Sequence, residues 1–161
     1  MPRITADQAG GANRCAFLDA IAVSELTEGL LQHSDDGYDV LVGSTATAPL
    51  LFDSYAKHPN VFNRRFNSTA AGRYQELYRN WLAYKDILQL QDFGPLSQDL
   101  MALQQIRECK ALPLIDAGDF AEAITAVAHI WASLPGAGYG QHENQMADLQ
   151  RAYVTAGGAL A

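Results

Sequence analysis

The sequence contains little cysteine and no long apolar run. Its two cysteines, Cys15 and Cys109, could form at most one disulfide, which excludes the small secreted domains that several bridges hold together. We therefore expect two buried or half-buried thiols. Nowhere do about 18 apolar residues follow one another, and no positive segment precedes an apolar run near Met1. Neither stable membrane insertion nor a signal peptide is expected.

Basic residues are also scarce. The chain has 11 Lys and Arg against 18 Asp and Glu, which gives a formal net charge of −7 at pH 7. Nucleic acids and anionic lipid surfaces are bound through basic patches, so this balance argues against both as partners. It also disfavours binding to any anionic polymer, unless the charge of the binding surface differs from that of the chain as a whole.

Several motifs that carry chemistry are missing. The histidines are scattered, without an H-E-x-x-H pair or a Cys/His cluster, so we expect no metal site and no cofactor. Ser24 and Ser133 lack the motif that surrounds a nucleophilic serine. The glycine-rich stretch 136–140 does not join a strand to a helix as a phosphate-binding loop does, and is interpreted as a loop. The histidines are His33, His58, His129 and His142.

The pattern of apolar residues predicts a mainly helical α+β fold in a single domain, 1–161, with frayed ends at 1–12 and 159–161. Residues 26–67 lose helical periodicity, are rich in turn-forming residues and contain short apolar pieces that favour short strands. A cleft between a β-containing lobe and a helical lobe is the expected site. Helices are predicted at 13–25, 76–88, from Ser97 through Ile106, at 116–133 and at 143–156.

Glu25 is the main candidate for acid–base chemistry. At helical spacing it shares one face with Leu18, Ile21 and Ala22, which places its carboxyl group at the end of an apolar stripe. Partial burial there would raise the pKa of the carboxyl group, as a general acid requires near neutral pH. The spacing is equally compatible with a glutamate that ends a helix and faces water.

A second carboxylate and a set of sugar-binding aromatic rings are less sharply indicated. Asp35, Asp36 and Asp39 could supply the second acid that glycoside hydrolases normally use, but aspartates beside glycine often shape turns. Tyrosines in or beside the predicted loops could stack on sugar rings or pack in the core. These are Tyr38, Tyr55, Tyr74 and Tyr139.

Seven separated blocks, in this order, closely resemble the lambda phage lysozyme family of endolysins. The likeness runs from about residue 14 to 158. The blocks are Ala16-Phe17-Leu18-Asp19 with Ser24-Glu25; Gly37-Tyr38-Asp39-Val40-Leu41-Val42-Gly43; His58-Pro59; Ser68-Thr69-Ala70-Ala71-Gly72-Arg73-Tyr74-Gln75; Phe93-Gly94-Pro95 with Ser97-Gln98-Asp99; Ala102-Leu103-Gln104-Gln105-Ile106; and 130–141, IWASLPGAGYGQ.

The resemblance implies a lysozyme-like fold with a small β-containing lobe and a helical lobe. It also implies a lytic transglycosylase, in which Glu25 protonates the glycosidic oxygen between N-acetylmuramic acid and N-acetylglucosamine and then acts as base. The C6 hydroxyl of the muramic acid attacks the anomeric carbon and closes a 1,6-anhydro ring. Because this nucleophile is intramolecular, neither a second carboxylate nor a cofactor is needed.

The same resemblance implies the substrate-binding residues and the partners. On the sheet side of the cleft it places Tyr38 and Asp39, with Ser68 and Gln75 bracketing the strand that faces the glycan. Tyr139 lies on one of two loops that close over the glycan, and the other loop is 57–66. The expected partner is the peptidoglycan glycan strand, bound by a monomer that stays in the host cytoplasm until a holin-like permeabiliser opens the membrane to the periplasm and cell wall.

The chain departs from the family pattern beside the proposed acid. Val23 replaces a tryptophan, Leu26-Thr27 replaces Gly-Thr, and residues 46–48 lengthen the loop after Gly43. Two alternatives therefore stand beside the transglycosylase. One is a hydrolytic muramidase that uses a second carboxylate, with Asp39 as the first candidate. The other is a non-catalytic wall-binding virion module that kept the fold.

Overall fold

The computed structural model describes residues 1–140 and 143–161, which divide into two compact units. Unit 1 comprises Met1–Glu25 and Ala102–Ala161, and unit 2 comprises Leu26–Met101. Two helices contain a unit boundary, α2 (Ala12–Gln32) and α4 (Pro95–Glu108). Among the described residues, no helix has both the length and the apolar character needed to cross a membrane.

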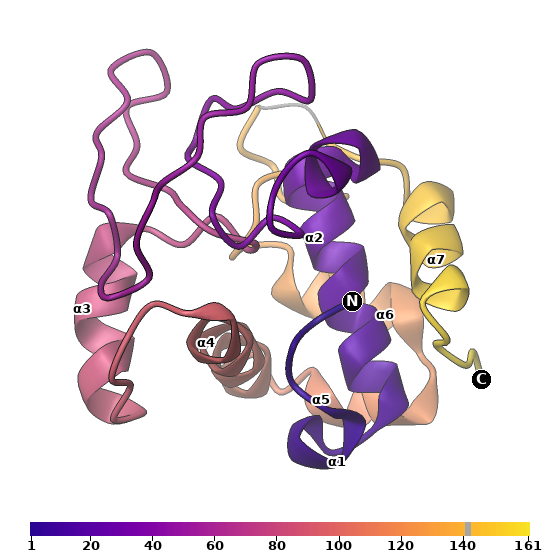
Figure 1. The fold of residues 1–161 in the computed structure, drawn as a ribbon. Coiled ribbons are helices and arrows are strands. Elements are labelled where there is room, and N and C mark those ends of the chain that lie inside the picture. Colours follow the sequence, from indigo (N-terminus) through magenta and orange to yellow (C-terminus); the bar gives the residue numbers. More distant parts are fainter. Residues whose placement is uncertain (141–142) are drawn as a thin grey trace. The chain divides into compact units, whose positions relative to one another are not determined.

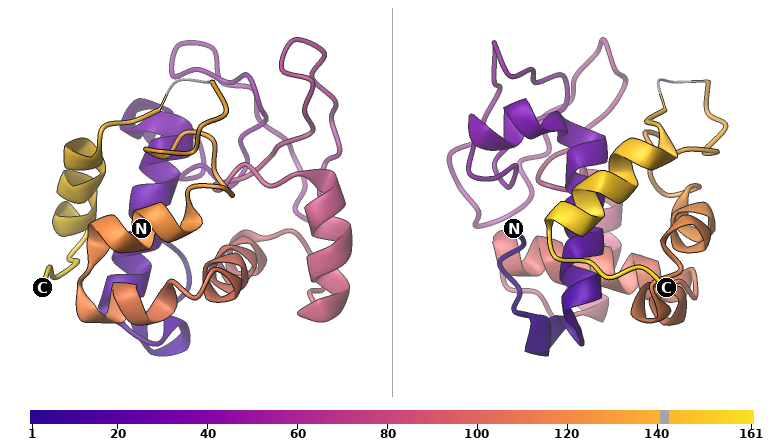
Figure 2. Two further views of the ribbon diagram at one scale, coloured as in Figure 1. Left: turned by 180° about the vertical axis from the view of Figure 1, so that it is seen from behind. Right: turned by 90° about the vertical axis from the view of Figure 1, so that its right-hand side faces the viewer.

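Unit 1 is helical and is built around the first part of α2. The other helices of this unit are α1 (Ala6–Ala9), the end of α4, α5 (Leu112–Ala117), α6 (Phe120–Val127) and α7 (Met146–Thr155) (Figure 1). In the view from behind, α6 crosses α2 (Figure 2). Phe120 of α6 lies between two rings, with centroid distances of 5.8 Å to Phe17 of α2 and 4.7 Å to Tyr153 of α7. One aromatic side chain thus joins three helices into a core.

Both ends of the chain form hydrogen bonds within unit 1, and fraying at 1–12 and 159–161 stays a prediction. Thr5 caps α1 in a reciprocal capping box with Gln8. At the other end, the backbone N–H of Ala159 donates to Oδ1 of Asn13 at 2.9 Å, and Ala161 donates to the carbonyl of Gly118 at 3.2 Å. Composition missed these bonds because Asn13 and Ala159 are distant in sequence.

Unit 2 contains the β structure, which consists of isolated antiparallel bridges. The segment around Val40 and Leu41 is central, because Val40 pairs with Leu51 on one side and Leu41 pairs with Ala71 on the other. Two further bridges, Thr45–Ala48 and Asn63–Ser68, close loops that project from the same side of this unit (Figures 1 and 2). The short strands expected within 26–67 thus appear as bridges at 40–41 and 51, and a further partner, Ala71, lies outside that range.

Helix α3 (Tyr78–Ile87) packs on this β structure through an aromatic core. Trp81 of α3 and Phe93 have ring centroids 5.3 Å apart, and both are buried. The ring of His58 contacts that of Phe93, with centroids 4.6 Å apart and the ring planes tilted by 54°. Its Nδ1 accepts the N–H of Asn60 at 3.0 Å. Its Nε2 must therefore carry the proton and donates to the carbonyl of Glu76, at 2.8 Å. Burial lowers the pKa of His58, so the imidazole is neutral.

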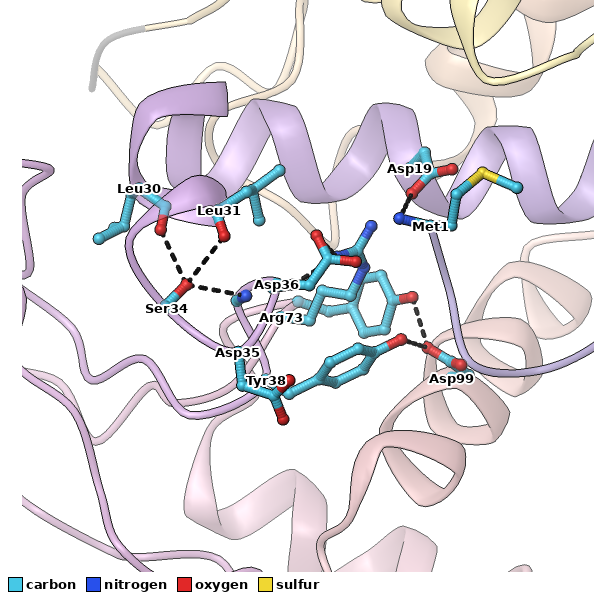
Figure 3. A network of polar contacts seen from close by, with 12 residues as sticks. Met1, Asp19, Leu30, Leu31, Ser34, Asp35, Asp36, Tyr38, Arg73 and Asp99 are labelled. Atoms are coloured by element: carbon cyan, nitrogen blue, oxygen red, sulfur yellow. Dashed lines mark hydrogen bonds and ion pairs between the residues drawn. The ribbon is translucent and has the colours of Figure 1, made fainter.

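A buried carboxylate fixes the polar core of unit 2. The hydroxyl of Tyr38 donates to Oδ1 of Asp99 at 2.8 Å (Figure 3). The hydroxyl of Tyr74 donates to the same oxygen at 2.7 Å. All three side chains are buried. Arg73, also buried, pairs with Asp36 at 2.7 Å and lies over the Tyr38 ring. Burial raises the pKa of Tyr74 well above its usual value, and the charge of Asp99 adds to the rise, so the phenol remains a donor.

Replacing Asp99 by alanine should destabilise the protein by about 2 to 5 kcal/mol, because two buried hydroxyls would lose their acceptor. Urea denaturation followed by tryptophan fluorescence measures this loss. Asp99→Asn is the matched control: it keeps an acceptor oxygen and should cost less. Equal unfolding free energies for the two variants would contradict this account of the tyrosine pair.

Candidate active site

Glu25 lies on α2 where the sequence placed it. Leu18, Ile21 and Ala22 on the same face are completely buried, which confirms the predicted apolar stripe, and the Glu25 side chain itself is half-buried. Two residues later the helix is broken, since Thr27 has φ 65° and ψ 152°. A β-branched residue rarely adopts positive φ, and such conformations cost about 1 to 3 kcal/mol. The predicted helix ended at Glu25, close to this kink, but helical structure resumes after Thr27 and continues to Gln32.

The Glu25 carboxyl has a raised pKa of about 7. Burial is the main cause, because a charged carboxylate loses hydration in this position. Hydrogen bonds from the hydroxyl and backbone N–H of Ser133 act in the opposite direction by stabilising the charged form. With a pKa near 7, the carboxyl group is both protonated and ionised to comparable extents at neutral pH, so it can give and take a proton.

A directed chain of hydrogen bonds ends on this carboxyl group. The Ser133 hydroxyl donates to Oε1 of Glu25 at 2.5 Å, and the Oγ atoms of Ser24 and Ser133 lie 2.8 Å apart. Because the single hydroxyl proton of Ser133 goes to Glu25, Ser24 must donate to Ser133. Asn144 in turn donates to Oγ of Ser24 at 3.0 Å. In this series of hydrogen bonds, the neutral side chains of Asn144, Ser24 and Ser133 act as donors and orient the carboxyl group of Glu25.

The same residues close the base of the loop that carries Tyr139. Ser133 accepts two bonds on its carbonyl oxygen from Asn144, at 2.8 Å from the backbone N–H and 3.2 Å from Nδ2. Glu143 accepts the N–H groups of Gly136 and Gly138 at 2.8 and 2.9 Å, which lowers the pKa of its carboxyl group. The loop base and the candidate acid therefore share one residue, Ser133.

Sequence reasoning considered Ser24 and Ser133 only as nucleophiles and did not consider Asn144. The only local signal was that Ser24 directly precedes Glu25. Ser133 and Asn144 are 108 and 119 positions further along the chain, and no periodicity relates them to Glu25. The block 130–141, which carries part of the resemblance, does contain Ser133.

The side chains of three predicted substrate-binding residues form hydrogen bonds with other residues of unit 2. Tyr38 is buried with its hydroxyl on Asp99. Asp39 accepts the N–H of Asp35 at 2.9 Å. Gln75, at φ 50°, donates through Nε2 to the carbonyl of Gly72 at 2.9 Å. These hydrogen bonds hold the three side chains within the fold of unit 2. Contact of these residues with substrate stays a prediction.

The two other predicted residues are more accessible. Ser68 is half-buried, its Oγ accepts the N–H of Ala70, and it lines a groove together with the start of α3. Tyr139 is 57% exposed, with its hydroxyl donating to the carbonyl of His129 at 2.7 Å, so that the ring is held at one edge while much of it faces solvent. Both could meet a ligand without rearrangement of a core.

The remaining acidic and metal-binding candidates have structural surroundings. Asp36 has a backbone φ of 50° and forms an ion pair with Arg73. Asp35 accepts the Tyr55 hydroxyl at 2.7 Å. Both are as expected of residues that shape a turn. Within the described ranges, no group of three or more His, Cys, Asp or Glu side chains could hold a metal ion. His142 lies outside those ranges. Cys15 is buried and Cys109 half-buried, both as free thiols, which confirms the prediction.

Comparison with known proteins gives a consistent result. A family model described as Endolysin matches residues 15–160. The endolysin of Escherichia phage lambda is 49% identical over 91% of this chain and 92% of its own length. The endolysin of Escherichia phage P2 is 47% identical, with both chains covered completely. Bacteriophage lambda lysozyme complexed with a chitohexasaccharide is similar in structure, with a TM-score of 0.85 at 45% identity over the whole of both chains.

A second solved structure, lysozyme from bacteriophage lambda, has a TM-score of 0.82 at 44% identity, again over both entire chains. These matches confirm the predicted lysozyme-like, mainly helical fold. They also confirm the resemblance on which the sequence analysis relied.

Replacing Ser133 by alanine should raise the pKa of Glu25 above 7, because the hydroxyl that favours the ionised form is removed while burial persists. Carbon-13 NMR titration of the Glu25 carboxyl measures the shift directly. Ser54→Ala, at an exposed position, is the control and should leave the titration unchanged. A lowered pKa in Ser133→Ala would show that the hydroxyl does not act as described.

Glu25→Gln should increase stability at alkaline pH and have little effect at acid pH. The Glu25 carboxyl titrates near 4.5 when unfolded and near 7 when folded. Below pH 4.5 it is protonated in both states, whereas between 4.5 and 7 only the unfolded state ionises, so the wild type loses stability as pH rises. Above pH 7 the loss is complete, at up to about 3 kcal/mol.

Paired unfolding curves of wild type and Glu25→Gln at pH 4 and pH 8.5 measure this difference, and other titrating groups cancel in the comparison. A gap in unfolding free energy of equal size at the two pH values would mean that Glu25 is not protonated by burial.

Proposed function

The chain belongs to the endolysin family, and from that premise we propose that it cleaves peptidoglycan as a lytic transglycosylase, with Glu25 as its acid and base. Membership of this family makes it a phage enzyme of the lysozyme type that degrades peptidoglycan. The finer assignment concerns the bond and the product: the β-1,4 bond between N-acetylmuramic acid and N-acetylglucosamine, and a 1,6-anhydromuramic end.

One observation carries this proposal, the pKa of about 7 at Glu25. Cleavage of a glycosidic bond requires a proton on the leaving oxygen, and formation of the anhydro ring requires the removal of a proton from the attacking hydroxyl. A single carboxyl group can perform both steps when it gains and loses its proton near the working pH. The chain Asn144–Ser24–Ser133 orients that group through neutral donors.

The steps balance without water or a cofactor. Protonated Glu25 gives its proton to the glycosidic oxygen as the bond from the anomeric carbon to that oxygen breaks. The C6 hydroxyl of the same muramic acid then forms the new bond to the anomeric carbon and passes its proton to the Glu25 carboxylate. The intramolecular hydroxyl supplies the effective concentration that a second protein nucleophile would otherwise provide.

We extend glycan binding to this chain because the similar lambda lysozyme is complexed with a chitohexasaccharide. The proposed contacts are those of the sequence analysis: Tyr38, Asp39, Ser68, Gln75 and Tyr139. The exposed ring of Tyr139 is suited to stack on a sugar face, and the Ser68 hydroxyl can bond a sugar hydroxyl.

The proposed setting is host lysis. We propose that the monomeric enzyme stays in the host cytoplasm until a holin-like partner permeabilises the membrane and lets it reach the periplasm and the wall. Family membership supports action on the cell wall.

Digestion of purified peptidoglycan should release muropeptides that end in 1,6-anhydromuramic acid, each lighter by one water than the hydrolytic product. Mass spectrometry of the digest decides between the two. Glu25→Gln should lower turnover by at least about a thousandfold, because the proton that assists departure of the leaving group is lost, while circular dichroism remains that of the wild type.

Two other outcomes would replace the proposal. Digests with only reducing muramic ends would indicate a hydrolase, and Asp39→Asn would then be the variant that tests for a second carboxylate. Wild-type protein that binds glycan without cleaving it would indicate a wall-binding virion module, an alternative motivated by Val23 and the altered residues after Glu25.

A further inference from the structure

A groove of about 330 Å³ lies within unit 2, between the loop 60–69 and the first turn of α3. Its apolar surface comes from Phe62, Leu77 and Tyr78. The side chain of Phe62 is 55% exposed, so it is not part of the core of unit 2. The groove therefore offers apolar surface to a ligand at a place where side chains of one compact unit surround it.

Two asparagines supply amide groups to this groove. Asn60 and Asn67 both adopt left-handed backbone conformations, with φ of 51° and 48°, which asparagine tolerates better than most residues. The backbone of Asn60 is fixed by its N–H bond to the buried His58. Neither carboxamide side chain bonds another residue in the described part of the chain. Each offers a donor and an acceptor to an incoming peptide group.

The charge of the groove is opposite to that of the chain. Arg79 lines it, is exposed, and forms no ion pair with any residue that the structure describes. None of the lining residues is acidic, in a chain with 18 acidic residues. Arg64 and Arg65 are exposed in the loop 60–69, but neither lines the groove. A guanidinium group with free donors favours a carboxylate or a phosphate as its partner.

We propose that this groove binds the short acidic peptide that the muramic acid of peptidoglycan carries, with Arg79 paired to a peptide carboxylate. Asn60 and Asn67 bond the peptide N–H and C=O groups, and the methyl side chains of the peptide lie on Leu77 and Tyr78. A phosphate needs several cations or a row of backbone N–H groups and gains nothing from apolar walls, so a peptide fits this surface better. The proposal rests on the proposed function, because it assumes that the chain meets peptidoglycan.

Titration with a soluble muramyl tripeptide tests binding without turnover, because this probe contains no glycosidic bond to cleave. The expected result is a set of saturable NMR shifts at the Arg79 guanidinium and at the side-chain amides of Asn60 and Asn67. Arg79→Gln should weaken the affinity about tenfold, as expected for loss of one charge-assisted bond. Arg64→Gln, an exposed arginine of the same loop that does not line the groove, is the matched control and should bind as the wild type does.

Inorganic phosphate and chitohexaose serve as the other probes. Shifts that are as large with phosphate as with the peptide would overturn the proposal in favour of a general anion site. Shifts of the same residues with chitohexaose would overturn it in favour of a sugar subsite. An absence of shifts with the tripeptide, or equal weakening by Arg79→Gln and Arg64→Gln, would overturn it as well.

A kinetic comparison separates this proposal from the proposed function. On intact peptidoglycan, Arg79→Gln should raise KM several-fold with kcat little changed, and on glycan strands stripped of peptide by an amidase it should match the wild type. Equal effects on both substrates would contradict peptide binding. Failure of the wild type to form anhydro ends would instead count against the proposed function, while the titration would still decide whether the groove binds peptide.

Discussion

The site depends on a balance at one carboxyl group, between burial and the hydrogen bonds that Ser133 donates. Burial would hold Glu25 protonated, and Ser133 counteracts this by donating to the ionised form. If burial acted alone, the group would give up its proton too reluctantly. If the hydrogen bonds dominated, it would be ionised at neutral pH and could not act as an acid. The pKa reaches about 7, above the ordinary value of 4.5, because burial outweighs the hydrogen bonds of Ser133, which offset only part of its effect.

The balance requires that Ser133 keeps its position, and the structure secures this from two sides. Ser24, on the same helix as Glu25, lies 2.8 Å from the Ser133 hydroxyl, and Asn144 holds the Ser133 carbonyl through two bonds. Since Asn144 also closes the loop that carries Tyr139, displacement of that loop would change the donors around Glu25. A residue far from Glu25 in sequence thus has influence on its proton affinity.

The sequence predicted the acid better than its surroundings. Glu25 could be recognised because a helix has a fixed period, so that Leu18, Ile21 and Ala22 show which face is buried. Helices α3, α4 and α7 were located within a few residues for the same reason. The expected helix at 116–133 is shorter than predicted, because α6 covers only Phe120–Val127. A separate helix, α5, comes before it, and Gly118 has a left-handed conformation between the two. The partners Ser133 and Asn144 could not be found because only tertiary packing brings them to Glu25.

The kink at Thr27 and the Tyr38 hydroxyl escaped prediction for a different reason. Local propensity favours neither, since a threonine at φ 65° and a buried tyrosine–carboxylate pair are stabilised by the structure around them. For Tyr38 the sequence left sugar stacking and core packing both open, because it showed only an aromatic residue beside a turn. Its hydroxyl on Asp99 gives it a place in the core of unit 2, and only the structure could separate this role from the exposed position of Tyr139.

Net charge was the observation that fitted a wall-degrading enzyme least well, and the distribution of charge resolves the difficulty. A net charge of −7 describes the field far from the protein, where salt screens it within about 10 Å. At contact distance, the groups nearest the ligand dominate, and the proposed peptide groove is lined by Arg79 and by no acidic residue. If this groove binds as proposed, an acidic chain meets an anionic polymer through Arg79, while the acidic remainder repels the polymer and limits binding elsewhere on the surface.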